Sequence, residues 1–330
     1  MDKKIAVSGI RPTGNLHFGN YFGAVKNFIE LQSTHQCYFF IANYHSLTTH
    51  TQSLEIKNSG FQIVCEYLAM GLDPEKAVLY LQSDLPQTAE LYLFLNMLAY
   101  KGELERVSTF KEKAKKHPDN VNAGLLTYPT LMAADILIHN ADVVPVGQDQ
   151  KQHIEMTRDF AQRFNHLYKK EVFNIPTPMA IKGDLIRVPG LTAQGKMSKS
   201  NAEKDAIFFT DQTSVLKKKI MAAVSDDGPK SMNSIKSIGV QNIFDLLNLV
   251  SNEETIHHFE TLYNNCSIRY GDLKKQLFDD AELFIAPIRE KIEYYKSKPN
   301  LIEDVLSAGK AKANFSAEAT MKVVRETLGF

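Results

Sequence analysis

Hydrophobic positions in the first 190 residues alternate between short runs and longer sets at helical spacing. The short runs are rich in β-branched and aromatic residues, and they predict strands at 5–7, 38–42, 78–82 and 143–146. Between them, apolar residues recur with the period of a helix within 18–29, 61–68, 91–100 and 125–138. Strands that alternate with helices are typical of a parallel sheet covered by helices. We therefore expect an α/β fold in this part of the chain.

The pattern changes after this alternating part. The segment 176–201 contains prolines, glycines and small polar residues with little periodic apolar pattern, so it predicts a domain junction with a mobile loop. Beyond it, spaced apolar positions predict helices at 216–224, 243–249, 255–263 and 273–295. No strand pattern follows the junction, and we expect a second domain that is entirely helical.

Composition limits the partners that the chain can have. Its 38 basic and 38 acidic residues cancel, so no overall field attracts nucleic acid, and any such contact must use a local patch. The three cysteines, Cys37, Cys65 and Cys266, lie far apart, which argues against a disulfide framework or a zinc site. The apolar run near the start is too short for a signal sequence or a membrane span. We expect a cytoplasmic protein with no membrane and no DNA partner.

The first strand leads into a glycine-bearing turn, Thr13 to Asn20, and then into a helix. Such a turn collects backbone N–H groups at the positive end of a helix dipole, which suits a phosphate. His17 and Asn20 are three residues apart and are expected on one face as donors. An ordinary turn with a surface histidine explains the motif equally well when it is taken alone. Neither of the two common phosphate-binding fingerprints, G-x-x-x-x-G-K-[ST] and G-x-G-x-x-G, is present.

A second candidate element is the lysine loop, Gly195 to Ser200, which reads Gly-Lys-Met-Ser-Lys-Ser. Two ammonium groups on a mobile loop can close over a leaving pyrophosphate and neutralise charge in the transition state. A lone lysine pair is more often a solvated surface. The lysine pair is informative here because the complete sequence Gly195 to Ser200 occurs together with the turn near the N-terminus.

These two motifs together resemble those of the class I aminoacyl-tRNA synthetases, with Asn20 standing for the last histidine of the first motif. The stretches 143–155 and 102–106 resemble the tryptophanyl-tRNA synthetases of bacterial type, and the resemblance continues to 327–330. It implies a Rossmann-type catalytic domain, a helical anticodon-binding domain and a homodimer. It also implies ATP with Mg²⁺, the metal being held mainly by the phosphates, and the substrates L-tryptophan and tRNA(Trp).

On this basis we divide the chain into four parts. They are a Rossmann-type catalytic domain with the ATP and tryptophan site at 1–190, the mobile lysine loop at 191–201, a helical anticodon-binding domain at 202–290, and C-terminal helices at 291–330. The last part is expected to pack back on the catalytic domain.

The resemblance also implies the site residues. The catalytic positions are His17, Asn20, Lys196, Ser198 and Lys199. The ATP contacts are Arg11, Pro12, Thr13, Gly19, Asn20, Gly147, Gln148, Asp149, Ile186, Lys196, Met197, Ser198, Lys199 and Ser200. The tryptophan contacts are Asp135, Met132, Tyr128, Gln150, His45 and Val7. No protein side chain is expected to bind a metal, and no general base is needed because the substrate carboxylate is already a nucleophile.

The choice of amino acid depends on the predicted helix that carries Tyr128, Met132 and Asp135. Their spacing places them on one face. Tyrosine enzymes of this architecture usually have a glutamine where Met132 stands. Indole has one N–H donor, for which a carboxylate is a natural acceptor, while the thioether can pack against the ring edge. Tyrosyl-tRNA synthetase remains the alternative.

The sequence also departs from the family pattern. Arg11 stands where many bacterial members have glutamine, which adds a positive charge, and Val7 replaces a larger aromatic residue found in some relatives. The lysine cluster from Lys111 to Lys116 can serve the acceptor arm of tRNA, or it can be a solvated face, and Lys217 to Lys219 can contact a phosphate. Two rivals of other classes remain: a small-molecule nucleotidyltransferase, and a synthetase-like RNA-binding paralogue without catalytic activity.

Overall fold

The chain forms two compact units, each built from separate stretches of sequence. The computed structural model describes residues 3–48, 53–116, 118–147, 150–179, 188–193, 195–197 and 202–330. The first unit comprises Met1–Gly14, Asn27–Lys182 and Lys298–Phe330, and the second comprises Asn15–Lys26 and Gly183–Ser297. No helix in the described part of the chain is long and apolar enough to cross a membrane.

The first unit is organised around a parallel sheet. Its strands are β1 (Ile5–Ile10), β2 (Gln36–Ile41), β3 (Ala77–Leu81), β4 (Val143–Pro145) and β5 (Thr177–Met179). They are arranged in the order β3-β2-β1-β4-β5, and every pair is parallel. The strand order reverses between β1 and β4, and ligands of open α/β sheets bind at the carboxyl ends of the strands at such a point. The predicted α/β fold is confirmed.

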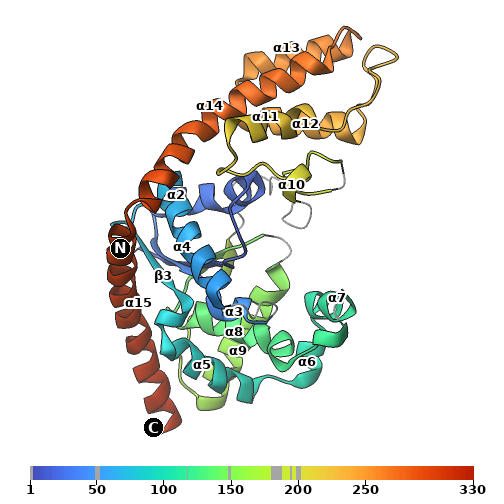
Figure 1. The fold of residues 1–330 in the computed structure, drawn as a ribbon. Coiled ribbons are helices and arrows are strands. Elements are labelled where there is room, and N and C mark those ends of the chain that lie inside the picture. The colour runs from blue at the N-terminus through green and yellow to red at the C-terminus, as the bar shows by residue number, and fades with distance from the viewer. Residues whose placement is uncertain are drawn as a thin grey trace. The chain divides into compact units, whose positions relative to one another are not determined.

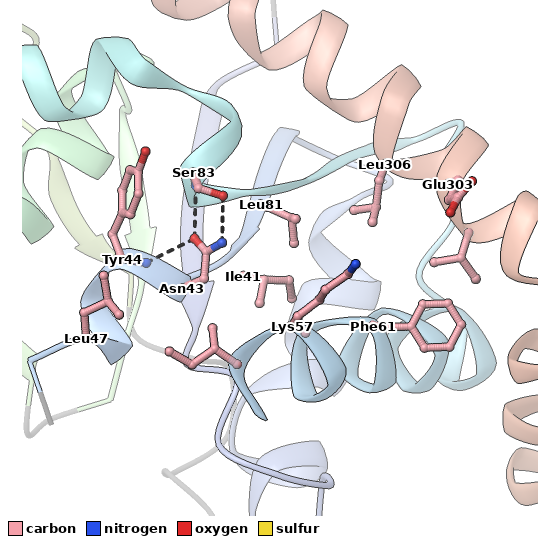
Figure 2. Close-up of a pocket in the computed structure, with 13 residues that line it drawn as sticks. Ile41, Asn43, Tyr44, Leu47, Lys57, Phe61, Leu81, Ser83, Glu303 and Leu306 are labelled. Carbon is pink, nitrogen blue, oxygen red and sulfur yellow. Dashed lines mark hydrogen bonds between the residues drawn. The ribbon is translucent and has the colours of Figure 1, made fainter. Parts of the chain in front are cut away.

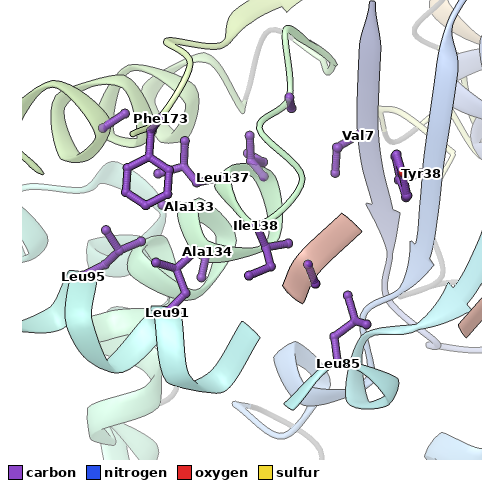
Figure 3. Packing of buried hydrophobic residues seen from close by; sticks show 14 of the residues in the cluster. Val7, Tyr38, Leu85, Leu91, Leu95, Ala133, Ala134, Leu137, Ile138 and Phe173 are labelled. Atoms are coloured by element: carbon purple, nitrogen blue, oxygen red, sulfur yellow. The ribbon is translucent and has the colours of Figure 1, made fainter. Parts of the chain in front are cut away.

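Helices cover this sheet or pack on the helices that do, and they supply much of the core. They are α2 (Lys26–Leu31), α3 (Asn43–Ser46), α4 (Ser53–Met70), α5 (Pro86–Leu98), α6 (Lys101–Glu105), α7 (Ser108–Lys116), α8 (Ala123–Leu137), α9 (Lys151–Tyr168) and α15 (Pro299–Leu328). Figure 3 shows side chains of α5 and α8 packed together beside β1, with Leu91, Ala134 and Val7 fully buried. The core therefore joins the inner faces of these helices to the sheet.

β5 was not predicted, because its three residues lie in the segment that we assigned to a junction. Pro178 in its centre cannot donate to a ladder, which restricts the strand to the edge of the sheet, where it lies beside β4. Such a short strand shows no alternation of apolar and polar residues.

The opposite edge strand, β3, is covered by α15 (Figure 1). The helix approaches closely because Gly309 has no side chain: a Cβ there would lie 1.8 Å from the carbonyl oxygen of Leu79. Further along α15, Ala313, Ala317 and Met321 are buried in the core of the unit. An edge that would otherwise expose unpaired backbone groups is thereby shielded.

The described part of the second unit is helical, with only isolated bridges between extended residues. Its helices are α1 (Phe18–Asn20), a π-helical turn (Tyr21–Val25), α10 (Ala202–Asp205), α11 (Thr213–Met221), α12 (Ile238–Val250), α13 (Glu253–Asn264) and α14 (Tyr270–Lys296). The rings of Phe18, Phe22, Phe209 and Phe284 form a cluster with centroids 5.4 to 6.1 Å apart. These contacts fasten the N-terminal segment to α14 within this unit.

Candidate active site

A cavity of about 270 Å³ lies in the first unit at the carboxyl ends of β1 and β4. Six residues predicted for the site line it: Val7, Arg11, His45, Met132, Asp135 and Gln150. Its other lining residues were not among the predicted substrate contacts; they are Ser8, Gly9, Phe40, Ala42, Ile136, Val144 and Val146. Most of the wall is apolar, and a few polar side chains converge on it, as in many small-molecule sites.

Asp135 is the buried acidic group of this cavity. It lies on α8, one turn after Met132, and only 4% of it is exposed. Burial raises the pKa of Asp135 well above its usual range, while a hydrogen bond from Gln82 lowers it. Gln82 Nε2 donates to both carboxylate oxygens at 2.8 Å. The site thus presents a hydrogen-bond acceptor within an otherwise apolar wall.

Tyr128 lies one turn before Met132 but is not among the lining residues. It belongs to a hydrogen-bond network that reaches the cavity wall at Gln150. Its hydroxyl is 2.7 Å from His153 Nε2 and bonds to Thr109, and His153 Nδ1 is 3.0 Å from Gln150 Oε1. Because Gln150 Oε1 can only accept, Nδ1 carries the proton and Nε2 accepts from Tyr128. The network fixes the direction of Gln150, which lines the cavity itself.

Two cations give the cavity an electropositive side. Arg11 lines it, and burial lowers the pKa of Arg11. Lys113 Nζ lies 4.7 Å from the centre of the Tyr128 ring, and burial followed by the charge of Arg11 lowers the pKa of Lys113. Burial first, then Arg11 and Lys113, lowers the pKa of His45 to about 3. His45 is therefore neutral at physiological pH, and the charge here suits an anionic substrate group.

The lysines of the predicted basic cluster do not share one environment. Lys111 and Lys115 are exposed on α7, whereas Lys113 is half-buried on the face that also carries Thr109. The spacing of Lys113 and Thr109, one helical turn apart, is the sequence signal for this face. Lys219, one of the three lysines predicted to contact a phosphate, bonds to Asp211 at 2.8 and 2.9 Å and is nearly buried. Lys217 and Lys218 are exposed on α11 (Thr213–Met221), and the phosphate contact stays a prediction for them.

The glycine-bearing turn is shared between the two units. Arg11, Pro12 and Thr13 follow β1 in the first unit, and Gly14, at φ +84°, is its last residue there. In the second unit, the backbone N–H of His17 donates to Asn20 Oδ1 at 3.1 Å. The amide oxygen of Asn20 is thus an acceptor, and its NH₂ is the group that can serve as a donor.

Within the second unit, the turn lies against the start of the lysine loop. A Cβ at Gly19 would lie 2.8 Å from His17 Cε1 and 3.7 Å from Met197 Cβ, so a larger residue there requires the His17 ring to move. Met197 is buried and its N–H donates to Val188, while Lys196 is exposed. Backbone pairing of 16–18 with 207–209 holds the turn in place. Gly147, in the first unit, accepts the N–H of Gln150. The remaining predicted residues lie outside the described part: Gln148, Asp149, Ile186, Ser198, Lys199 and Ser200.

A larger cavity, of about 390 Å³, lies between α3, α4, β3 and α15 (Figure 2). Its wall is mainly apolar, and the amide of Asn43 bonds to both the backbone N–H and the hydroxyl of Ser83. The charged residues of its wall are Lys57 and Glu303, and no residue predicted for the site lines it. We therefore assign the functional site to the smaller cavity.

Comparison with known proteins gives the family. The family model for class I tRNA synthetases (W and Y) matches residues 2–286. A tryptophan–tRNA ligase of Porphyromonas gingivalis is 53% identical over 324 residues, which cover 98% of each chain. The corresponding protein of Fusobacterium nucleatum is 41% identical over 327 residues, which cover 99% of this chain and 98% of the relative.

Solved structures agree with this. The tryptophanyl-tRNA synthetase of Campylobacter jejuni, complexed with ADP and tryptophan, matches with a TM-score of 0.88 at 33% identity, covering 99% of this chain and 100% of that one. Both the sequence and the fold are therefore shared along nearly the full length. The chain belongs to the class I tRNA synthetases of the tryptophan and tyrosine family and, within it, to the tryptophan–tRNA ligases.

Proposed function

We propose that this chain activates L-tryptophan with ATP, forming tryptophanyl-adenylate and pyrophosphate, and then transfers tryptophan to the 3′ end of tRNA(Trp). The observation that carries the proposal is the buried carboxylate of Asp135 in an apolar cavity at the switch point of the sheet. Met132 lies one turn away on the same wall. The tryptophan–tRNA ligases among its relatives support this choice of substrate.

The cavity fits an indole better than a phenol. An indole presents a broad apolar ring with a single N–H donor, and Asp135 is an acceptor for it. Met132 and Phe40 supply apolar contact to the ring. A phenol hydroxyl both donates and accepts, so it requires a second polar partner. A site built to bond one substrate group rejects an analogue without that group by a factor on the order of 10⁴.

Adenylation at this site consists mainly of positioning and charge stabilisation. The tryptophan carboxylate attacks the α-phosphorus of ATP, a new oxygen–phosphorus bond forms, and pyrophosphate leaves. Arg11 and Lys113 place positive charge beside the cavity, where the substrate carboxylate or the phosphates lie. His17, Asn20, Lys196 and Lys199 are proposed to stabilise the phosphates from the turn and the lysine loop.

ATP is proposed to act with Mg²⁺. The described residues contain no group of three or more histidine, cysteine, aspartate or glutamate side chains that could hold a metal ion. We propose that the phosphate oxygens of ATP are the main ligands of Mg²⁺, and we assign no step of the reaction to the metal.

Two further parts of the proposal concern partners. The exposed lysines Lys111 and Lys115 are proposed to contact the phosphates of tRNA(Trp). Leu93 and Met97 lie four residues apart on one face of α5, 50% and 74% exposed, and are proposed to be covered in a homodimer. The protein is proposed to act in the cytoplasm.

The test is amino-acid-dependent exchange of pyrophosphate into ATP, measured over a panel of amino acids. Tryptophan alone is expected to support exchange. Exchange driven by tyrosine would assign the alternative substrate, and no exchange with any amino acid would favour a paralogue without catalytic activity. Exchange without an amino acid would favour a small-molecule nucleotidyltransferase.

The assignment of Asp135 is tested separately by Asp135→Ala. Loss of a hydrogen bond to a charged group is expected to reduce kcat/KM for tryptophan by at least about tenfold to a hundredfold, with little change in ATP affinity. ATP affinity is measured by equilibrium binding. An equal loss of tryptophan and ATP affinity would show general damage to the site instead.

A further inference from the structure

Asp135 is held by a side chain whose own direction is fixed at its other end. Gln82 lies directly after β3 and is only 1% exposed. Its Oε1 accepts the backbone N–H of His45 at 3.1 Å, and its Nε2 donates to both oxygens of Asp135. Because a backbone N–H can only donate, the amide oxygen must face His45 and the NH₂ must face Asp135.

The backbone on either side of Gln82 is also held. The N–H of Leu81 donates to Asp84 Oδ2 at 3.0 Å. On the other side, Asn43 Oδ1 accepts the N–H of Ser83 at 3.0 Å, and Asn43 Nδ2 donates to its hydroxyl at 2.7 Å (Figure 2). The end of β3 and the start of α3 are thereby locked together, and Gln82 lies between them.

The bridging NH₂ group matches one protonation state of Asp135. An ionised carboxylate accepts at both oxygens, whereas a protonated carboxyl carries an O–H on one of them and loses one of the two bonds. Burial raises the pKa of Asp135, and the Gln82 hydrogen bond opposes that effect. An indole N–H also needs an acceptor. The Gln82 NH₂ group and the indole N–H are therefore both best served by the ionised form of Asp135.

We propose that Gln82 is a positioning residue for recognition of the indole N–H, which keeps Asp135 as an acceptor and fixes the direction of its lone pairs toward the cavity. Gln82 does not line the cavity, so it acts through Asp135. The inference rests on the proposed function, because it assumes that Asp135 accepts from the substrate.

Gln32 provides a matched control. It is also buried, 6% exposed, in the same unit; its Oε1 accepts the N–H of Asp73 at 2.9 Å and its Nε2 donates to the carbonyl of Gly71 at 3.1 Å. Its partners lie outside the cavity wall. Replacement of either glutamine by leucine removes a buried amide with the same kinds of bonds, but only one of them holds Asp135.

The test compares L-tryptophan with 3-benzothienylalanine, in which a sulfur atom replaces the indole N–H, as substrates in pyrophosphate exchange. The wild-type protein is expected to prefer tryptophan strongly. In Gln82→Leu this preference in kcat/KM should fall by about tenfold to a hundredfold, through a higher KM for tryptophan with little change in kcat. Gln32→Leu should lower the thermal midpoint but keep the preference.

The pH dependence separates an electrostatic role from a role in packing. In Gln82→Leu, Asp135 lacks its donor, so KM for tryptophan should fall as the pH rises and the carboxyl ionises. In Gln82→Glu, which keeps the size of the side chain, the introduced carboxyl shares a proton with Asp135 at low pH and repels it when ionised. In this variant KM should instead rise as the pH rises.

The outcomes are distinguishable. If the wild-type protein has the same kcat/KM for the analogue and for tryptophan, the assignment of Asp135 is refuted. The proposed recognition of the indole N–H is then refuted with it. A wild-type preference that persists unchanged in folded Gln82→Leu would overturn the role of Gln82 alone. If the leucine variant does not fold, a flat pH profile of KM in Gln82→Glu would overturn it.

Discussion

His139 is a buried histidine whose environment disfavours its charge. It stacks on Tyr38 with ring centroids 4.1 Å apart, its Nε2 lies 2.8 Å from the Tyr80 hydroxyl, and its Nδ1 lies 3.0 Å from the Ser316 hydroxyl. Burial lowers the pKa of His139 to about 3. The side chain therefore ties β2, β3 and α15 together as a neutral ring.

The pH dependence of stability follows from this shift. Below about pH 6.5 the unfolded chain binds a proton at His139, while the folded chain binds none until about pH 3, so stability falls as the pH falls through this window. Between pH 7 and pH 5 the contribution is about 2 kcal/mol. In His139→Gln the urea midpoint should depend less on pH over this interval. The same change at exposed His257 should leave the wild-type dependence intact.

The cavity was predictable from the sequence only where its residues share one helix or a family motif. Met132 and Asp135 lie three residues apart on α8, so helical spacing alone predicted their common face. Phe40, which lines the cavity, lies in β2, and Gln82, which bonds to Asp135, directly follows β3; no local pattern marks either residue. Their position depends on the order of strands in the sheet, which is a tertiary property.

At the scale of elements, α15 approaches β3 closely at Gly309. The carbonyl of Leu79 occupies the space beside Gly309 where any other residue would place its Cβ. A backbone carbonyl in a strand cannot move aside as a flexible side chain can. The position therefore requires glycine, although glycine within a helix is normally unfavourable by about 1 kcal/mol relative to alanine.

Gly309→Ala should consequently destabilise the first unit by about 1 to 3 kcal/mol, because α15 must shift away from the strand. Thermal unfolding followed by circular dichroism measures the change. Gly271→Ala on α14 is the control: nothing lies within 4 Å of its Cβ position, and a gain of about 0.5 kcal/mol is expected. Equal midpoints for the two variants would contradict the close approach of helix and strand.

The local pattern predicted the strands better than it predicted the helices. The four predicted strands overlap β1 to β4, and each predicted helix overlaps an observed one, although 61–68 covers only the second half of α4 and the 18-residue α9 was not predicted. The π-helical turn Tyr21–Val25 was not predicted, because its apolar residues have nearly the same spacing as those of an α-helix. The backbone pairing of 16–18 with 207–209 joins segments nearly 200 residues apart, beyond the reach of any local pattern.

For the whole molecule, the residues of the predicted site are distributed over the two units. The chain leaves the first unit after Gly14 and returns to it at Asn27, so Thr13 and His17, which belong to one sequence motif, lie in different units. Lys196 belongs to the second unit and Asp135 to the first. The residues proposed for the reaction are therefore divided between the two units.

Binding of tRNA is a property of local charge in a molecule whose formal net charge is zero. Substitution of Lys111 and Lys115 by glutamine should weaken binding of tRNA(Trp) and reduce the slope of log Kd against log salt by about 1 for each lysine that neutralises a phosphate. Filter binding over a salt series measures the slope. The control is Lys76→Gln, which removes an exposed lysine paired with Asp73. An unchanged slope in the double variant would refute the proposed role of these lysines.

The covering of β3 by α15 also has a consequence for synthesis on the ribosome. β3 ends at Leu81 and α15 begins at Pro299, so most of the chain is translated before the helix can reach the strand. Throughout that interval the nascent sheet has an uncovered edge, which can pair with a neighbouring nascent chain. Conditions that slow translation between these two elements should therefore favour aggregation, even though the finished protein hides this edge.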